Sequence, residues 1–100
     1  MPTAYITAPP DAAGELAELL VEERLAACVN RFPCTSVYRW EGDVVRDEEV
    51  VLLAKTTDEA WAKLVARVED EHPYDVPCVE RFEERAMSEP FEAWRDAEVE

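Results

Sequence analysis

Positively charged residues are scarce in this chain of 100 residues. Ten Lys and Arg stand against 24 Asp and Glu, and Lys55 and Lys63 are the only lysines. The resulting net charge of −14 repels phosphate backbones and anionic lipid headgroups, so we expect neither nucleic acid nor a membrane surface as a partner. Long apolar runs are absent as well, because no stretch approaches the roughly 18 residues that cross a bilayer.

Paired cysteines are missing too. Cys28, Cys34 and Cys78 are an odd number for a disulfide framework, and no two of them form the C-x-x-C motif found in zinc and redox sites. The chain begins without the basic and apolar regions of a signal peptide. The sequence therefore predicts a cytosolic protein with reduced thiols.

The excess of acidic residues has two interpretations. It is typical of proteins that stay soluble in a salty cytoplasm, and it would also suit a surface that binds cations. The acids are spread along the whole chain, which favours solvation over a cation site. The hydrophobic share of 48% is sufficient for one core, so we expect a single domain over residues 1–100.

Hydrophobic residues alternate between the two-residue period of strands and the 3.6-residue period of helices. Thr56 and Glu59 match a capping box before the second helical pattern. In order, the pattern predicts a strand at 3–7, a helix from the N-cap Asp11 to Arg24, a long strand at 26–41 interrupted by Pro33, a turn at 42–43, a strand at 49–55, a helix up to residue 72, a strand at 76–85, and a short helix after the N-cap Ser88.

This order of elements is that of the ferredoxin-like split βαβ fold, an α+β sandwich of four strands and two helices with a short C-terminal helix added. Both helices of such a fold lie on one face of the sheet, so the other face has no cover. Tyr38 and Trp40 would lie on that bare face beside the apolar side of the central strand. An uncovered apolar face favours self-association.

Four stretches, in the same order and spacing, resemble the CutA family, proteins named for divalent-cation tolerance. They are LAACVN at 25–30, SVYRWEG at 36–42, EVVLLAKT at 49–56 and HPYDVP at 72–77. The resemblance implies a PII-like homotrimer of ferredoxin-like subunits that binds divalent metal, copper above all, and contributes to metal tolerance. It attaches no reaction chemistry to the chain. Since no motif of a nucleophilic triad or a P-loop is present either, we expect no enzyme.

The chain departs from the family pattern at positions that matter for metal binding. The family usually has Glu where this chain has Cys78. Some members carry Cys where this chain has Ile6, and a second His where it has Glu71. The copper site of those members is therefore not present intact, and of its ligands only His72 remains.

His72 is the only histidine and the first candidate metal ligand, because imidazole suits copper, zinc and nickel. Glu71 beside it and Cys78, six residues further on, are candidate co-ligands. The alternative is structural. His72 would end the second helix, where the macrodipole favours it, and the His-Pro pair would shape a turn.

Tyr38, Trp40, Lys55 and Tyr74 are candidates to line a cleft between subunits. The alternative assigns the aromatic residues to interface packing and Lys55 to an ion pair with an acid such as Glu49. The sequence thus predicts a cytosolic homotrimer that binds copper or another divalent cation. The second prediction is a PII-like module whose clefts between subunits hold a small ligand or a partner protein.

Overall fold

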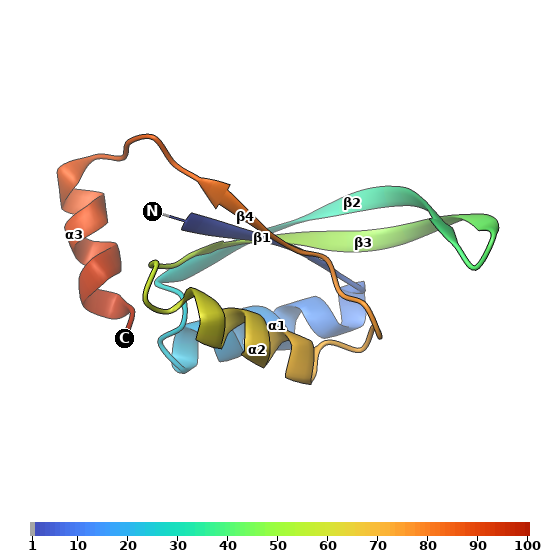
Figure 1. Ribbon diagram of the computed structural model, residues 1–100, viewed down its shortest axis with the longest axis horizontal. Helices are drawn as coiled ribbons and strands as arrows, with labels where there is room; N and C mark the ends of the chain where they lie inside the picture. The colour runs from blue at the N-terminus through green and yellow to red at the C-terminus, as the bar shows by residue number, and fades with distance from the viewer. Residues whose placement is uncertain (1) are drawn as a thin grey trace.

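The computed structural model describes residues 2–100, which form four strands and three helices (Figure 1). They are β1 (Pro2–Ala8), α1 (Pro10–Glu22), β2 (Cys28–Trp40), β3 (Asp43–Lys55), α2 (Trp61–Glu71), β4 (Val79–Glu83) and α3 (Glu89–Glu98). The predicted order of elements is confirmed, including the terminal helix with Ser88 as its N-cap.

The strands form one antiparallel sheet in the order β2-β3-β1-β4. Each βαβ unit has a strand of the other unit inserted between its own two strands, which is the split arrangement. Helices α1 and α2 lie together on one face of the sheet (Figure 1). The predicted α+β ferredoxin-like fold is therefore confirmed.

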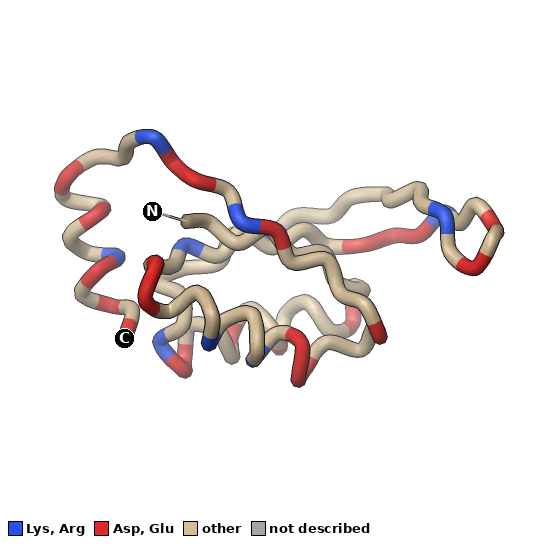
Figure 2. The backbone as a smooth tube through the Cα atoms, in the orientation of Figure 1, with Lys and Arg blue, Asp and Glu red and all other residues tan. Residues whose placement is uncertain are grey.

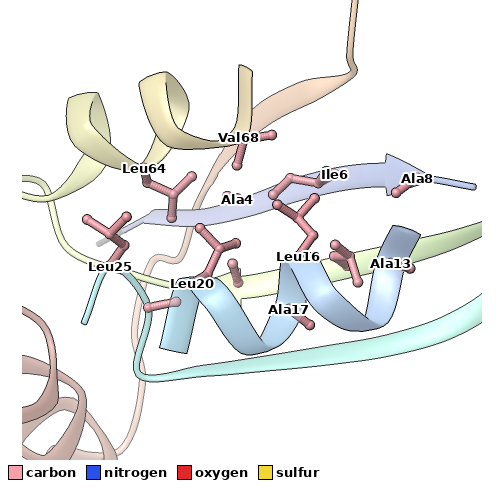
Figure 3. Close-up of a cluster of buried hydrophobic side chains, with 13 residues drawn as sticks. Ala4, Ile6, Ala8, Ala13, Leu16, Ala17, Leu20, Leu25, Leu64 and Val68 are labelled. Carbon is pink, nitrogen blue, oxygen red and sulfur yellow. The ribbon is translucent and has the colours of Figure 1, made fainter. Parts of the chain in front are cut away.

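The core lies between the sheet and these two helices (Figure 3). Alternate residues of β1 point into it, and α1 contributes a stripe with the spacing i, i+3, i+4, i+7. Its members are Ala4, Ile6, Ala8, Ala13, Leu16, Ala17, Leu20, Leu25, Ala26, Leu52, Ala54, Leu64 and Val68. The sheet supplies mainly alanines to this core, which leaves room for the larger side chains of the helices.

The hairpin of β2 and β3 is longer and more regular than predicted. β3 begins at Asp43 rather than Glu49, and β2 runs through Pro33 without a break. Proline is tolerated because β2 is an edge strand, where one side of the backbone has no partner strand. Glu41 and Gly42 form the two-residue turn with φ values of 50° and 89°, the positive pair that a type I′ hairpin requires.

The distal part of this hairpin, residues 34–49, projects from the body of the molecule, and we call it the arm (Figure 1). β1 pairs with β3 only at positions 50–55, so the arm is a ribbon of two strands. An isolated two-stranded ribbon is marginally stable in water at best. The arm therefore needs contacts beyond its own backbone pairing.

Several predicted ends are wrong. α1 starts at Pro10 with Pro9 as the N-cap, instead of being capped by Asp11, and it ends at Glu22 rather than Arg24. Proline at the first helical position removes no helical hydrogen bond, because that N–H would have no partner in the helix. β4 is confined to 79–83 instead of 76–85, because only this segment pairs with β1.

The predicted capping box of Thr56 and Glu59 is also wrong. Thr56 is fully buried, and its hydroxyl donates to the Leu25 carbonyl at 2.7 Å, which joins the end of β3 to the turn after α1. The hydroxyl of Thr57 accepts the Ala60 amide at 3.2 Å instead, and α2 begins one residue later. Thr56 thus makes a tertiary contact, and its neighbour Thr57 accepts a hydrogen bond at the start of α2.

Helix α3 stands at the end of the sheet, beside the start of β1 (Figure 1). Its Arg95 is buried, and Val99 just beyond its end packs against Ala27 and Ala60 in a small second cluster. These contacts fix one side of α3 to the body of the molecule.

Two neighbouring residues of α1 differ in burial, and truncating each of them tests which side of the helix packs in the core. Leu20 is fully buried, whereas Val21 is 41% exposed. We expect Leu20→Ala to lower the free energy of unfolding by about 2–5 kcal/mol, because it removes buried methyl groups and leaves a cavity. Val21→Ala, the matched control, should change it by less than about 0.5 kcal/mol. Urea unfolding followed by circular dichroism measures both, and equal losses would contradict this description of the core.

Candidate functional site

The face of the sheet opposite α1 and α2, which we call the open face, carries a set of large apolar side chains. Strand register identifies them, since paired residues point to the same side and the neighbours of core residues point away from the core. Phe32 and Trp40 are each 46% exposed and Phe82 is 47% exposed. Tyr5 stacks on Phe82 with ring centroids 5.3 Å apart. The predicted bare apolar face is therefore present within the described chain.

His72, at the end of α2, is held by both of its ring nitrogens. Nε2 lies 2.8 Å from the Thr7 carbonyl oxygen, and Nδ1 lies 3.1 Å from the Tyr74 amide nitrogen. A carbonyl can only accept and an amide N–H can only donate, so the imidazole is neutral with its proton on Nε2. The side chain is only 7% exposed. Binding of a metal at either nitrogen would require one of these hydrogen bonds to break.

Tyr74 continues this connection to the open face. Its ring contacts that of His72 at 4.8 Å between centroids, and its hydroxyl donates to Glu49 Oε2 at 3.1 Å. Glu49 is 6% exposed, so this hydroxyl is a principal partner of a nearly buried carboxylate. Burial, and then the hydrogen bond and charge of Glu49, raise the pKa of Tyr74 to about 12. The loop after α2 is thus tied to β1 through His72 and to β3 through Tyr74.

The three predicted metal ligands point to three different partners. Glu71 Oε1 pairs with Arg67 at 2.5 Å, and Arg67 also bonds Glu23 just beyond the end of α1. The Cys78 thiol lies on the open face and donates to Glu80 Oε1 at 3.5 Å. Burial, followed by Glu80, raises the pKa of the Cys78 thiol. Over residues 2–100, no three His, Cys, Asp or Glu side chains converge to hold a metal ion.

A second thiol shares the open face with Cys78. Cys34 stands opposite Glu49 in the β2–β3 register, and its Sγ is 3.8 Å from Ser36 Oγ. Burial raises the pKa of Tyr5, and both of these thiols then raise it further. Sequence reasoning missed this grouping, because β2, β3 and β4 bring the residues together from distant parts of the chain. The alternation of side chains along each strand was the one available signal.

The predicted cleft residues are separated within one chain. Trp40 lies at the tip of the arm, opposite Asp43, whereas Lys55 lies at the far end of β3 beside Cys28 and Thr3. The suggested pair of Lys55 with Glu49 does not form, since Glu49 contacts Tyr74. Tyr38, also on the arm, donates its hydroxyl to Asp47 Oδ2. A cleft that contains all four predicted residues would need more than one copy of the chain.

Charge is distributed over the whole molecule (Figure 2). Asp and Glu occur on both core helices, on the arm and on α3, and the few Lys and Arg lie among them. Arg67 illustrates the local use of a cation, because it contacts Glu23 through two bonds of 2.8 and 2.9 Å and also pairs with Asp70 and Glu71. Across residues 2–100, no helix is both long and apolar enough to span a bilayer.

The topology, the bare sheet face and the hairpin arm define a ferredoxin-like subunit of the PII-like class. The chain belongs to the CutA1 divalent ion tolerance protein family, whose model matches residues 3–98.

Individual relatives agree with this assignment. The divalent-cation tolerance protein CutA of Thermus thermophilus is 57% identical over 74 residues, which are 72% of each chain. The protein of the same name from Pyrococcus horikoshii is 35% identical over 91 residues, covering 90% of this chain and 89% of that one.

Solved structures extend the likeness to the whole chain. The divalent cation tolerance protein of Thermus thermophilus superposes with a TM-score of 0.95 at 43% identity, with both chains fully covered. The PII-like protein CutA from Nostoc sp. PCC 7120, in apo form, superposes with a TM-score of 0.96 at 32% identity, covering 100% of this chain and 98% of that one.

The bond between Tyr74 and Glu49 predicts a measurable stability difference. We expect Tyr74→Phe to lower the free energy of unfolding by about 1–3 kcal/mol at neutral pH, since a nearly buried carboxylate loses a donor. Thr35→Val is the control, because it removes an exposed hydroxyl–carboxylate bond, from Thr35 to Glu48 at 3.3 Å, on the side of the arm away from the open face, and it should cost under about 1 kcal/mol. Urea unfolding measures the loss in both variants, and equal losses would contradict a special role of the bond between Tyr74 and Glu49.

The same hydroxyl predicts a loss of stability at alkaline pH. The pKa of Tyr74 is about 12 in the folded chain, against roughly 10 in an unfolded one, so the folded state holds this proton more tightly. Its contribution is fully present below pH about 10 and is lost as the pH rises toward about 12. Unfolding measured at stepped pH should show a smaller loss in Tyr74→Phe. Parallel curves for variant and wild type would contradict this environment.

Proposed function

We propose that this chain acts in divalent-cation tolerance as a cytosolic homotrimer, and that copper is the cation it binds. The observation that carries the proposal is the open face, an apolar surface that the chain's own helices leave bare. Its exposed aromatic residues are of the kind enriched in interface cores. Three copies whose open faces meet around a threefold axis would bury them.

Cation binding is assigned to donors on the open face. Cys78 and Glu80 supply one thiol and one carboxylate from neighbouring positions of the same chain. Two donors hold a metal weakly, so the proposed site takes further ligands from a neighbouring copy. Thiolate is a soft ligand that suits Cu(I) and zinc, and among divalent cations copper generally binds more tightly than zinc. Binding would release the thiol proton.

His72 has a supporting place in this proposal. The hydrogen bonds of His72 to Thr7 and Tyr74 orient the loop that leads to Cys78. Ligation by His72 itself, the first candidate from sequence, would compete with those bonds. The three free thiols support a reducing compartment, since such groups persist where disulfides do not form.

A second candidate function uses the same assembly without metal. Tyr38, Trp40, Lys55 and Tyr74 offer aromatic surface, one ammonium group and one hydroxyl for a small ligand or a partner protein. Lys55 favours this candidate, because it forms no ion pair with any residue among 2–100 despite the excess of acids. A ligand that copurifies with the protein, combined with no measurable copper binding, would favour this function over the first.

Copper titration separates the candidate ligands. We expect Cys78→Ser to weaken binding of Cu²⁺ by at least about tenfold, because a hydroxyl is a far poorer ligand than a thiolate for this cation. Cys28→Ser is the matched control, since Cys28 lies at the other end of the open face beside Lys55. Anaerobic calorimetry, with thiol content checked before and after, gives the affinities. Loss of binding in His72→Ala with retention in Cys78→Ser would instead make the histidine the ligand.

Light scattering during size exclusion tests the assembly. At about 1 M salt, where charges are screened beyond roughly 3 Å, the particle should contain three chains. At about 0.01 M salt the screening length is roughly 30 Å, and the negative chains, each with a net charge of −14, repel one another more strongly. We therefore expect the trimer dissociation constant to be higher at low salt. Sucrose at equal osmolarity controls for solvent effects. A monomer at all concentrations would refute the trimer.

A further inference from the structure

Two thiols lie on the open face, at its opposite edges. Cys34 belongs to β2 and Cys78 comes just before β4, and these two strands are the edges of the sheet. Both are half-buried, free thiols within the described chain. Their polar contacts are long, since Cys34 Sγ lies 3.8 Å from Ser36 Oγ and Cys78 Sγ lies 3.5 Å from Glu80 Oε1. Thiols are weak donors and weak acceptors, so either sulfur can change its partner at little cost.

Each thiol has a carboxylate beside it on the same face. Glu49 stands directly opposite Cys34 in the β2–β3 register, and Glu80 lies two residues beyond Cys78. Tyr5, which pairs with Glu80, lies on β1 between the two edges. Burial raises the pKa of Tyr5 first, and then both thiols and both carboxylates raise it further. The four groups therefore belong to one environment, although they come from three strands and a loop.

The chemistry of these donors selects a soft cation. Of the two carboxylates, Glu49 is already held by the Tyr74 hydroxyl at 3.1 Å. The sulfurs are therefore the main donors, and thiolate sulfur selects Cu⁺. Cu⁺ is satisfied by two sulfur ligands in a line, whereas Zn²⁺ takes four ligands in a tetrahedron. Two thiolates can thus complete a site for Cu⁺.

The two sulfurs of one chain cannot share an ion. Strands β3 and β1 lie between β2 and β4, and with neighbouring strands about 4.8 Å apart the edges are separated by about 14 Å. Two metal–sulfur bonds of about 2.3 Å each, the length found for zinc, do not span that distance. In a closed ring of copies each contact joins unlike surfaces, so the β2 edge of one sheet can meet the β4 edge of the next.

We propose that Cys34 of one subunit and Cys78 of the next hold one Cu⁺ between them, in the copper-binding trimer of the proposed function, on which this inference rests. Cys34 supplies the second sulfur that Cys78 lacks within its own chain. Both thiols lose their protons when the ion binds, and the copper keeps its oxidation state. Glu80, which contacts Cys78 without metal, stays beside the ion. One site forms at every contact between subunits.

Titration with Cu⁺ tests the pair. Under argon, Cu⁺ is added as its acetonitrile complex in the presence of bicinchoninate, whose colour reports the ion that the protein leaves free. We expect Cys34→Ser and Cys78→Ser each to weaken binding at least about tenfold, and the double variant to bind no more weakly than either, because one site needs both sulfurs. Cys28→Ser is the matched control, because Cys28 lies on the same strand and the same face as Cys34, and it should bind like the wild type.

Mixed trimers show whether the site lies between subunits. Chains with Cys34→Ser and chains with Cys78→Ser are co-expressed with different affinity tags, and trimers that contain both are isolated with the two tags in turn. In a ring, one contact of each mixed trimer joins an intact Cys34 to an intact Cys78, so about one third of the wild-type capacity should return. A site within a single chain would return none.

X-ray absorption of the wild-type protein loaded with Cu⁺ gives a measurement that needs no variant. We expect the copper to be bound by two sulfur atoms. Nitrogen bound to the copper would overturn the pair and make His72 the ligand instead.

The outcomes separate this inference from the proposed function. Loss in both single variants, with recovery in the mixed trimers, supports the shared site. A Cys34→Ser chain that binds Cu⁺ like the wild type, or mixed trimers that bind none, overturns it, and copper binding by the wild-type trimer then still supports the proposed function. A wild-type chain that binds neither Cu⁺ nor Cu²⁺, or that stays a monomer, overturns both. Circular dichroism and light scattering identify any variant that fails to fold or assemble.

Discussion

A sheet of four strands has two faces, and this chain supplies helices for only one of them. α1 and α2 close a core built on the small alanines of the sheet, and large side chains that point the other way, such as Phe32 and Phe82, are left to water or to a partner. Hydrophobic surface of this kind is costly to leave exposed. Other copies of the chain that covered this second face would bury the exposed aromatic residues of the open face.

The loop between α2 and β4 shows how a motif associated with metal can be structural in the isolated chain. His72 takes the place of a strand partner at the end of β1, because its Nε2–H reaches the Thr7 carbonyl where β4 no longer pairs. Tyr74 then reaches across to the nearly buried Glu49 on β3. The pair holds the loop against two strands, and the loop in turn sets where β4, with Cys78 just before it, enters the sheet. In the single chain both ring nitrogens of the histidine are thus used in holding the loop.

What could be predicted from sequence depended on whether a residue's role was local. The stripe of Leu16, Ala17 and Leu20 marks α1 because a helix repeats its buried side every turn. Residues 43–49 were missed as a strand because neither side of the arm is covered by helices, so no clear alternation marks a core side. The partners of His72 and Tyr74 lie 65 and 25 residues away in the chain, and nothing in the neighbouring sequence identifies them. The predicted helix starts were wrong where a proline took the N-cap position, as at α1, or where the expected capping residue made a tertiary hydrogen bond, as Thr56 does.

The arm's dependence on partners has a consequence for the life of the chain. Its ribbon has backbone pairing but no core, so in an unassembled subunit it opens at little free-energy cost, and segments that open easily are those that proteases cut. In an assembly that covered the arm, the same segment would stay closed. Degradation would thus remove chains in excess of complete assemblies, and the amount of protein would be matched to assembly by the instability of a single hairpin.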